Sequence, residues 1–145
     1  IVGNSTLNVF CPVLKYYNSV FYLLFWCAGK LFLTKFSNLP IQSSNFTYNL
    51  NPMYLIAGNH NFDDTSNSAH PFFKQLVSQE KIIILKNDYD YFETDINMQA
   101  AGMVVSTNSR FAGSIFVYYK LPSGDLVVKQ VSPGGIVSNP SKIGD

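Results

Sequence analysis

The chain has 145 residues, the size of one domain, and it is long enough to bury a substantial hydrophobic core. Charged residues make up only 13% of the sequence and the formal net charge is +1, which argues against the clustered basic surface that binds nucleic acid. Aromatic residues reach 15%, and Asn and Ser are abundant. This composition is more typical of an extracellular, surface or virion protein than of a cytosolic enzyme.

Residues 12–29 form the most apolar segment, and their pattern predicts one long amphipathic helix. Pro12 suits the first turn of a helix, and Gly29 suits the position just after its end. The longest unbroken apolar run, Val20 to Ala28, has nine residues, whereas a membrane-spanning helix needs about 20. The segment therefore favours a buried core helix over a membrane-embedded one. The apolar residues at helical spacing are Val13, Tyr17, Val20, Phe21, Leu24, Cys27 and Ala28.

The spacing of the two cysteines distinguishes this helix from a hairpin. A helix places Cys11 and Cys27 about 24 Å apart, and a disulfide needs Cα atoms within about 7 Å. A β-hairpin that turns at Asn18-Ser19 would instead place the two cysteines opposite each other. We prefer the helix because its proline, glycine and polar face agree, and the hairpin remains the alternative.

The rest of the chain predicts a short helix and a series of strands. The helix is expected over residues 71–79, because Pro71 suits the first helical position and the apolar residues after it share one face. Apolar runs predict strands at 30–36, 53–57, 82–85, 103–106, 113–121 and 126–131. The last three are joined by hairpin-like connections, which indicate an antiparallel meander.

The expected fold class is therefore α+β. One long amphipathic helix and one short helix would pack on a mainly antiparallel sheet that ends in a β-meander. Residues 1–131 would form a single domain, and the polar residues 132–145 a C-terminal arm or linker.

The residues after the predicted strand 53–57 carry the first candidate chemistry. The sequence Ala57-Gly58-Asn59-His60 resembles a motif of the metallophosphoesterases, in which an Asn and a His just past a strand bind metal. The other ligand motifs of that family, Asp-x-His, Gly-Asp-x-x-Asp and Gly-x-His, have no counterparts in this sequence. Because two-metal chemistry needs a dense set of ligands, a simple turn is the favoured interpretation.

The sequence offers two further candidates, a wider metal site and a thiol site. His60, Asp63, Asp64 and His70 have the ligand types that suit zinc, but their spacing matches no known ligand pattern. Cys11 precedes the predicted helix, where the dipole favours a thiolate. This position and the segment Leu121 to Val128 resemble the papain-like hydrolases. In that family the histidine base comes after the strand that the segment Leu121 to Val128 resembles. Here His60 would have to serve as the base from an earlier place in the chain.

The main functional prediction is a non-enzymatic structural or interaction subunit of a larger assembly, such as a virion, a surface appendage or a secreted complex. It would need no cofactor, and its partners would be other protein subunits. Aromatic side chains on strands make good interface anchors, and the candidates are Tyr89, Tyr91, Phe92, Tyr118 and Tyr119. A row of exposed aromatic rings would equally suit a carbohydrate-binding module.

The alternative prediction is a small hydrolase that uses Cys11 with His60, or a metal held by the loop at 59–70. Two sequons, at Asn4 and Asn45, would carry glycans if the chain passes through a eukaryotic secretory pathway.

Overall fold

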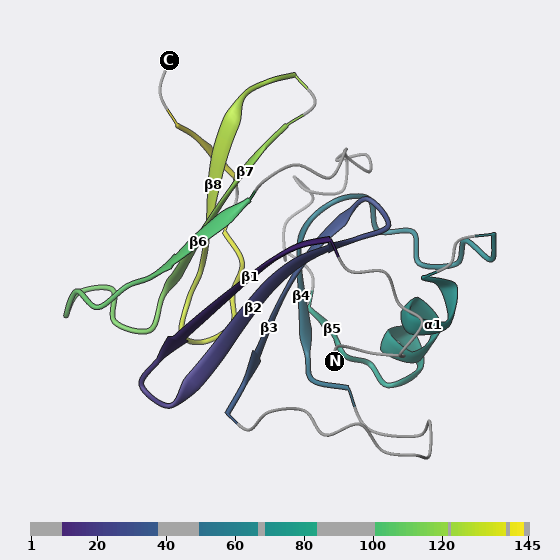
Figure 1. The fold of residues 1–145 in the computed structure, drawn as a ribbon, viewed down its shortest axis with the longest axis horizontal. Helices are drawn as coiled ribbons and strands as arrows, with labels where there is room; N and C mark the ends of the chain where they lie inside the picture. Colours follow the sequence, from purple (N-terminus) through teal and green to yellow (C-terminus); the bar gives the residue numbers. More distant parts are fainter. Residues whose placement is uncertain are drawn as a thin grey trace.

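The computed structural model describes residues 10–37, 50–66, 69–83, 101–121, 123–138 and 140–143. Of these residues, 49% lie in strands and 9% in a single helix. Two sheets and the helix form three layers, with one sheet in the middle, the second sheet on one side of it and the helix on the other (Figure 1). The expected α+β fold is therefore wrong, because the described part of the chain is mostly β.

Sheet A, the central layer, has five strands in the order β1-β2-β3-β4-β5. Neighbouring strands are antiparallel except β4 and β5, which are parallel and are connected through helix α1. The elements are β1 (Phe10–Tyr17), β2 (Val20–Cys27), β3 (Lys30–Phe36), β4 (Met53–Ala57), α1 (His70–Ser78) and β5 (Ile82–Ile83). The predicted short helix and the predicted strands 30–36 and 53–57 are confirmed.

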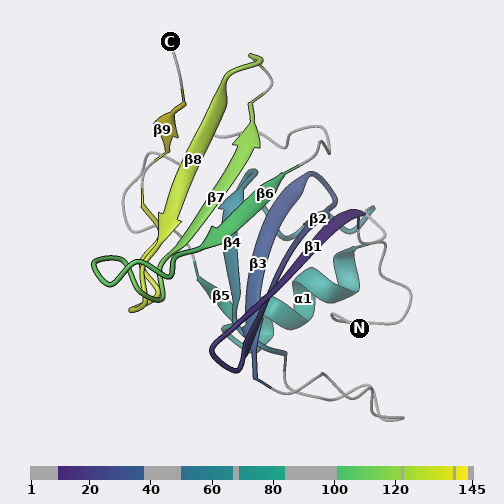
Figure 2. The same ribbon diagram turned by 60° about the vertical axis from the view of Figure 1, so that its left-hand side comes forward.

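Sheet B, the outer layer, is an antiparallel sheet in the order β6-β7-β8-β9 (Figure 2). Its strands are β6 (Gly102–Val105), β7 (Ile115–Lys120), β8 (Leu126–Val131) and β9 (Ser141–Lys142). The meander predicted for the last third of the chain is thus confirmed.

The long helix predicted over residues 12–29 does not form, and β1 and β2 occupy this segment. The chain reverses at Asn18-Ser19, where φ is 51° and 66°, and again at Ala28-Gly29, where φ is 53° and 80°. Two consecutive residues with positive φ are typical of the type I′ turn, which joins antiparallel strands. The hairpin alternative was therefore the correct one.

The strands of sheet A supply two separate cores. Alternate side chains of β2 point to opposite faces of the sheet, so Leu24 and Trp26 pack against sheet B, whereas Phe25 and Cys27 pack toward α1. Phe72, Phe73 and Leu76 of the helix are buried in this second core. Aromatic residues favour strands that are covered on both faces, which explains why this segment forms a sheet.

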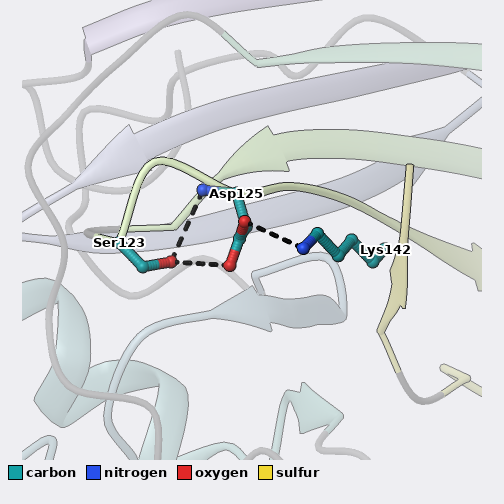
Figure 3. Close-up of polar contacts among 3 residues, drawn as sticks. All are labelled: Ser123, Asp125 and Lys142. Carbon is teal, nitrogen blue, oxygen red and sulfur yellow. Dashed lines mark hydrogen bonds and ion pairs between the residues drawn. The ribbon is translucent and has the colours of Figure 1, made fainter. Parts of the chain in front are cut away.

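The C-terminal segment folds back along sheet B. Val137 forms a bridge with Val131 and is buried in the core between the sheets, and β9 pairs with β8. Figure 3 shows how the end of β9 is held to the β7–β8 turn. Lys142 Nζ lies 3.3 Å from Asp125 Oδ1, and Ser123 Oγ donates a 3.1 Å hydrogen bond to Asp125 Oδ2.

Candidate functional site

Strand β1 is an exposed edge of sheet A. It pairs with β2 on one side, and no strand of the described residues pairs with its other side. Six of its eight residues are exposed, among them Leu14 at 55% and Tyr16 at 61%. Unpaired main-chain groups on an edge strand are a template for pairing with another chain. This edge is therefore the first candidate for a binding surface.

An aromatic row crosses sheet A beside this edge. The Tyr16 and Phe21 ring centroids are 4.7 Å apart, and the Phe21 and Phe36 rings stack at 5.3 Å. These side chains lie on the α1 side of the sheet, but the buried residues under the helix come from farther along β2, β3 and β4. The row thus extends the apolar face of sheet A out to the edge strand.

A row of charged and phenolic side chains crosses the same strands on the opposite face. Lys15 lies directly opposite Tyr22, and Tyr22 lies opposite Lys35. Burial lowers the pKa of Lys35, whose ammonium lies 5.3 Å from the centroid of the Tyr54 ring. Burial also raises the pKa of Tyr22, with a smaller contribution from Tyr17. Within the described residues, neither lysine has a carboxylate partner.

Sequence reasoning missed the row of Lys15, Tyr22 and Lys35, because these residues come together only in the register of the two hairpins. The signal that could have found it is the pair of two-residue turns, at Asn18-Ser19 and Ala28-Gly29. Given those turns, Lys15, Tyr22 and Lys35 follow as cross-strand neighbours.

The outer face of sheet B carries a second exposed apolar surface, which we call the outer patch. Val104 is 56% exposed, Tyr118 43% and Leu126 40%. Val104 lies opposite Phe116, and Tyr118 is diagonal to both Val104 and Leu126 in the register of the sheet. Phe111 extends the patch, since its ring meets that of Phe116 at 6.1 Å. The outer patch comprises Val104, Phe111, Phe116, Tyr118 and Leu126.

The predicted aromatic anchors divide between core and surface. Tyr118 belongs to the outer patch, whereas Tyr119 is completely buried between the sheets and is a core residue. The other anchors, Tyr89, Tyr91 and Phe92, lie outside the described residues. The sequons at Asn4 and Asn45 also lie outside them.

The loop after β4 uses its polar side chains to shape its own backbone. Asn59 Oδ1 accepts from the Asn61 N–H, Asn61 Oδ1 accepts from the Asp63 N–H, and Asp64 Oδ1 accepts from the Ser66 N–H, at 2.9–3.0 Å. Side chains that bond the main chain two residues later form Asx-turns. These contacts give the loop a structural role.

Lys30 joins this loop to the β2–β3 hairpin. It is only 2% exposed, and its ammonium donates a 2.9 Å hydrogen bond to Asn59 Oδ1. The same ammonium lies 5.6 Å and 5.5 Å from the ring centroids of Phe62 and Phe73. The hydrogen bond and the aromatic faces together compensate for removing this cation from water.

The thiol candidate and its proposed base come from distant strands. Cys11 is exposed on β1, whereas His60 follows β4, three positions along the sheet. Three inter-strand spacings amount to about 14 Å, so the sheet does not bring these two side chains together. Both cysteines are free. The turn pairs Tyr17 with Val20, and this register does not place Cys11 opposite Cys27, so the facing of the cysteines that the hairpin alternative predicted is wrong. Burial raises the pKa of Cys27 to about 12.

The predicted metal ligands do not form a cluster. His60, Asp63 and Asp64 lie in the loop and His70 begins α1, and among the described residues no three His, Cys, Asp or Glu side chains are grouped to hold a metal. Hydrogen bonds from Ser66 are the main reason why the pKa of Asp64 is low, and Lys30 and His70 add smaller contributions.

In the part of the chain that the structure describes, no helix is long and apolar enough to span a membrane. No protein-family model matches the sequence, and no curated protein or solved structure matches it either.

Proposed function

We propose that this protein is a non-enzymatic interaction subunit of a larger extracellular, surface or virion assembly, and that it makes its contacts through exposed strand surfaces. The observation that carries this proposal is the outer patch, where Val104, Tyr118 and Leu126 are each at least 40% exposed on one sheet face. Contiguous exposed apolar surface on a soluble domain marks an interaction site. Aromatic residues such as Tyr118 are common anchors of such sites.

The polar loop after β4 supports the same proposal, because its side chains hold its own backbone. Asn59, Asn61 and Asp64 are engaged in turns of their own backbone, and Asn59 also accepts from Lys30. A hydrolase would need a base within hydrogen-bond reach of its nucleophile. Cys11 lies on β1 and His60 follows β4, and these two strands are about 14 Å apart.

A site-specific photo-crosslinker tests the proposal. Placed at position 118 in the organism that makes the chain, it should give one discrete cross-linked species, and Val104→Lys should abolish that species. The same crosslinker at Val77, which is 50% exposed on α1, is the matched control and should give no such species. A purified monomer that hydrolyses a model ester, and loses this activity in His60→Ala, would support the hydrolase instead.

A further inference from the structure

We propose that the open edge of β1 accepts an extended segment of another protein as an added antiparallel strand, and that this segment carries an acidic residue opposite Lys15. The inference rests on the proposed function and specifies a partner for the edge of sheet A, whereas the outer patch lies on sheet B.

The edge directs main-chain groups outward over a short, defined length. Because Tyr17 and Val20 pair across the two-residue turn, Val13, Lys15 and Tyr17 direct their N–H and C=O groups toward β2. Leu14 and Tyr16 direct theirs outward, where no strand of the described residues pairs with them. Pro12 has no N–H, and Cys11 has φ of 50°, so the ladder of an added strand would end there.

The two faces of the edge predict the sequence pattern of the added strand. Leu14 and Tyr16 lie on the face that carries the aromatic row, so their cross-strand partners should be apolar. Lys15 lies on the other face, at the end of the row that continues through Tyr22 to Lys35. A residue opposite Lys15 occupies the closer, non-hydrogen-bonded type of pair, where a carboxylate meets Lys15, which has no carboxylate partner among the described residues. The predicted pattern is apolar–acidic–apolar.

A second copy of this chain fits the edge less well. Two β1 strands related by a two-fold axis use all the outward groups of Leu14 and Tyr16 only when each Leu14 faces a Tyr16. That register places Lys15 directly opposite the Lys15 of the second copy, and like charges at this position are destabilising. The other registers pair Tyr16 with Pro12, which lacks an N–H, or extend into the turn at Asn18. An edge lysine is a known protection against self-pairing.

A synthetic peptide, carboxyfluorescein-Ser-Thr-Ile-Glu-Val-Thr-Ser-amide, tests the proposal by fluorescence anisotropy with the purified chain. We expect saturable binding that weakens about two- to fivefold when the Glu is replaced by Gln, the range measured for cross-strand charge pairs, and weakens further with Lys. Lys15→Glu should reverse the order of the Glu and Lys peptides. Lys120→Glu, an exposed strand lysine on sheet B, makes the same charge change elsewhere and should leave the order unchanged.

A proline at position 14 tests the main-chain hydrogen bonds of the added strand. Leu14→Pro removes an outward N–H and keeps the pairing with β2, so it should abolish peptide binding while thermal unfolding stays cooperative. Equal binding of the Glu, Gln and Lys peptides would overturn the acidic partner. No peptide binding, or a dimer that Leu14→Pro dissociates, would overturn the added strand, and the cross-links at position 118 would still decide the proposed function separately.

Discussion

The ammonium of Lys129, a completely buried side chain on β8, donates a hydrogen bond to the main-chain carbonyl of Ile56 on β4. The contact therefore joins the two sheets across their common core. The same ammonium lies 5.5 Å from the centroid of the buried Tyr119 ring. A buried cation is tolerated only when it has such partners, so this lysine fixes how sheet B sits on sheet A.

Lys129→Ala should strongly destabilise the protein. It removes the contact with Ile56 and leaves a cavity that three buried carbon atoms and the ammonium nitrogen had filled, and we expect a loss of about 2–4 kcal/mol in the free energy of unfolding. Lys129→Met keeps most of the volume and removes the charge, so its cost should be below about 1.5 kcal/mol. Urea unfolding measures both values. Lys120→Ala, at an exposed position of β7, is the control and should change stability by less than about 0.5 kcal/mol.

Ser19→Gly should stabilise the protein by about 0.5–1 kcal/mol. Ser19 has φ of 66° in the β1–β2 turn, and glycine adopts this conformation without strain. In a helix the same change would cost about 0.5 kcal/mol. The sign of the change in melting temperature therefore distinguishes the hairpin from the helix.

Gly58→Ala should be far more damaging than Gly102→Ala. Gly58 has φ of 110°, and an added Cβ would lie 3.0 Å from the Gly29 carbonyl oxygen and from Lys30 Cα, which are main-chain atoms. We expect a cost of about 2–3 kcal/mol from the strained backbone and this contact. At Gly102 the atoms nearest to the Cβ would be those at the tip of the Tyr118 ring, which is exposed and can turn away. Equal losses in thermal unfolding would contradict this difference.

The two thiols should differ in reactivity. Cys11 is exposed and should react with Ellman's reagent in the native state at pH 8, whereas Cys27, with a pKa raised to about 12, should react only after unfolding. The pKa in the unfolded chain is near 9.0, so the native state binds more protons between these two values. Stability should accordingly fall as the pH rises from about 9 to 12. A Cys27→Ala variant should show a smaller fall, and an equal fall would assign it to other groups.

Ser123→Ala should raise the pKa of Asp125 toward its ordinary value of 3.8. The hydrogen bond from Ser123 is the largest cause of the low pKa, and the contacts with Lys142 come next. Lys142→Ala removes both a hydrogen bond and a nearby positive charge, so it should also raise this pKa. Carboxyl NMR titration gives both values, and an unchanged pKa in Ser123→Ala would contradict the assignment.

Much of the fold could be predicted where one pattern dominates. The bounds of β3, β4 and β8 follow from their apolar runs, and Pro71 places the start of α1 within one residue. The meander follows from short strands separated by turn residues. These segments needed only local information.

The segment 12–29 could not be predicted in this way. A strand covered on both faces shows no alternation of apolar and polar residues, so the periodicity of β2 does not distinguish a strand from a helix. Lys15, Asn18, Ser19 and Tyr22 happen to fall on one side of a helix. In the structure Asn18 and Ser19 form a turn, and Lys15 faces Tyr22 across the hairpin. The candidate surfaces depended on this hairpin and could not be found without it.

The double coverage of sheet A also has a consequence for folding accuracy. Since β2 presents apolar side chains to both cores, a slip by one residue would exchange the two sets without exposing either to water, and hydrophobicity alone gives little protection against this error. The tight reversals at Asn18-Ser19 and Ala28-Gly29 must therefore determine the alignment of the strands. A single residue inserted into either reversal should trap the chain in a misaligned, aggregation-prone sheet.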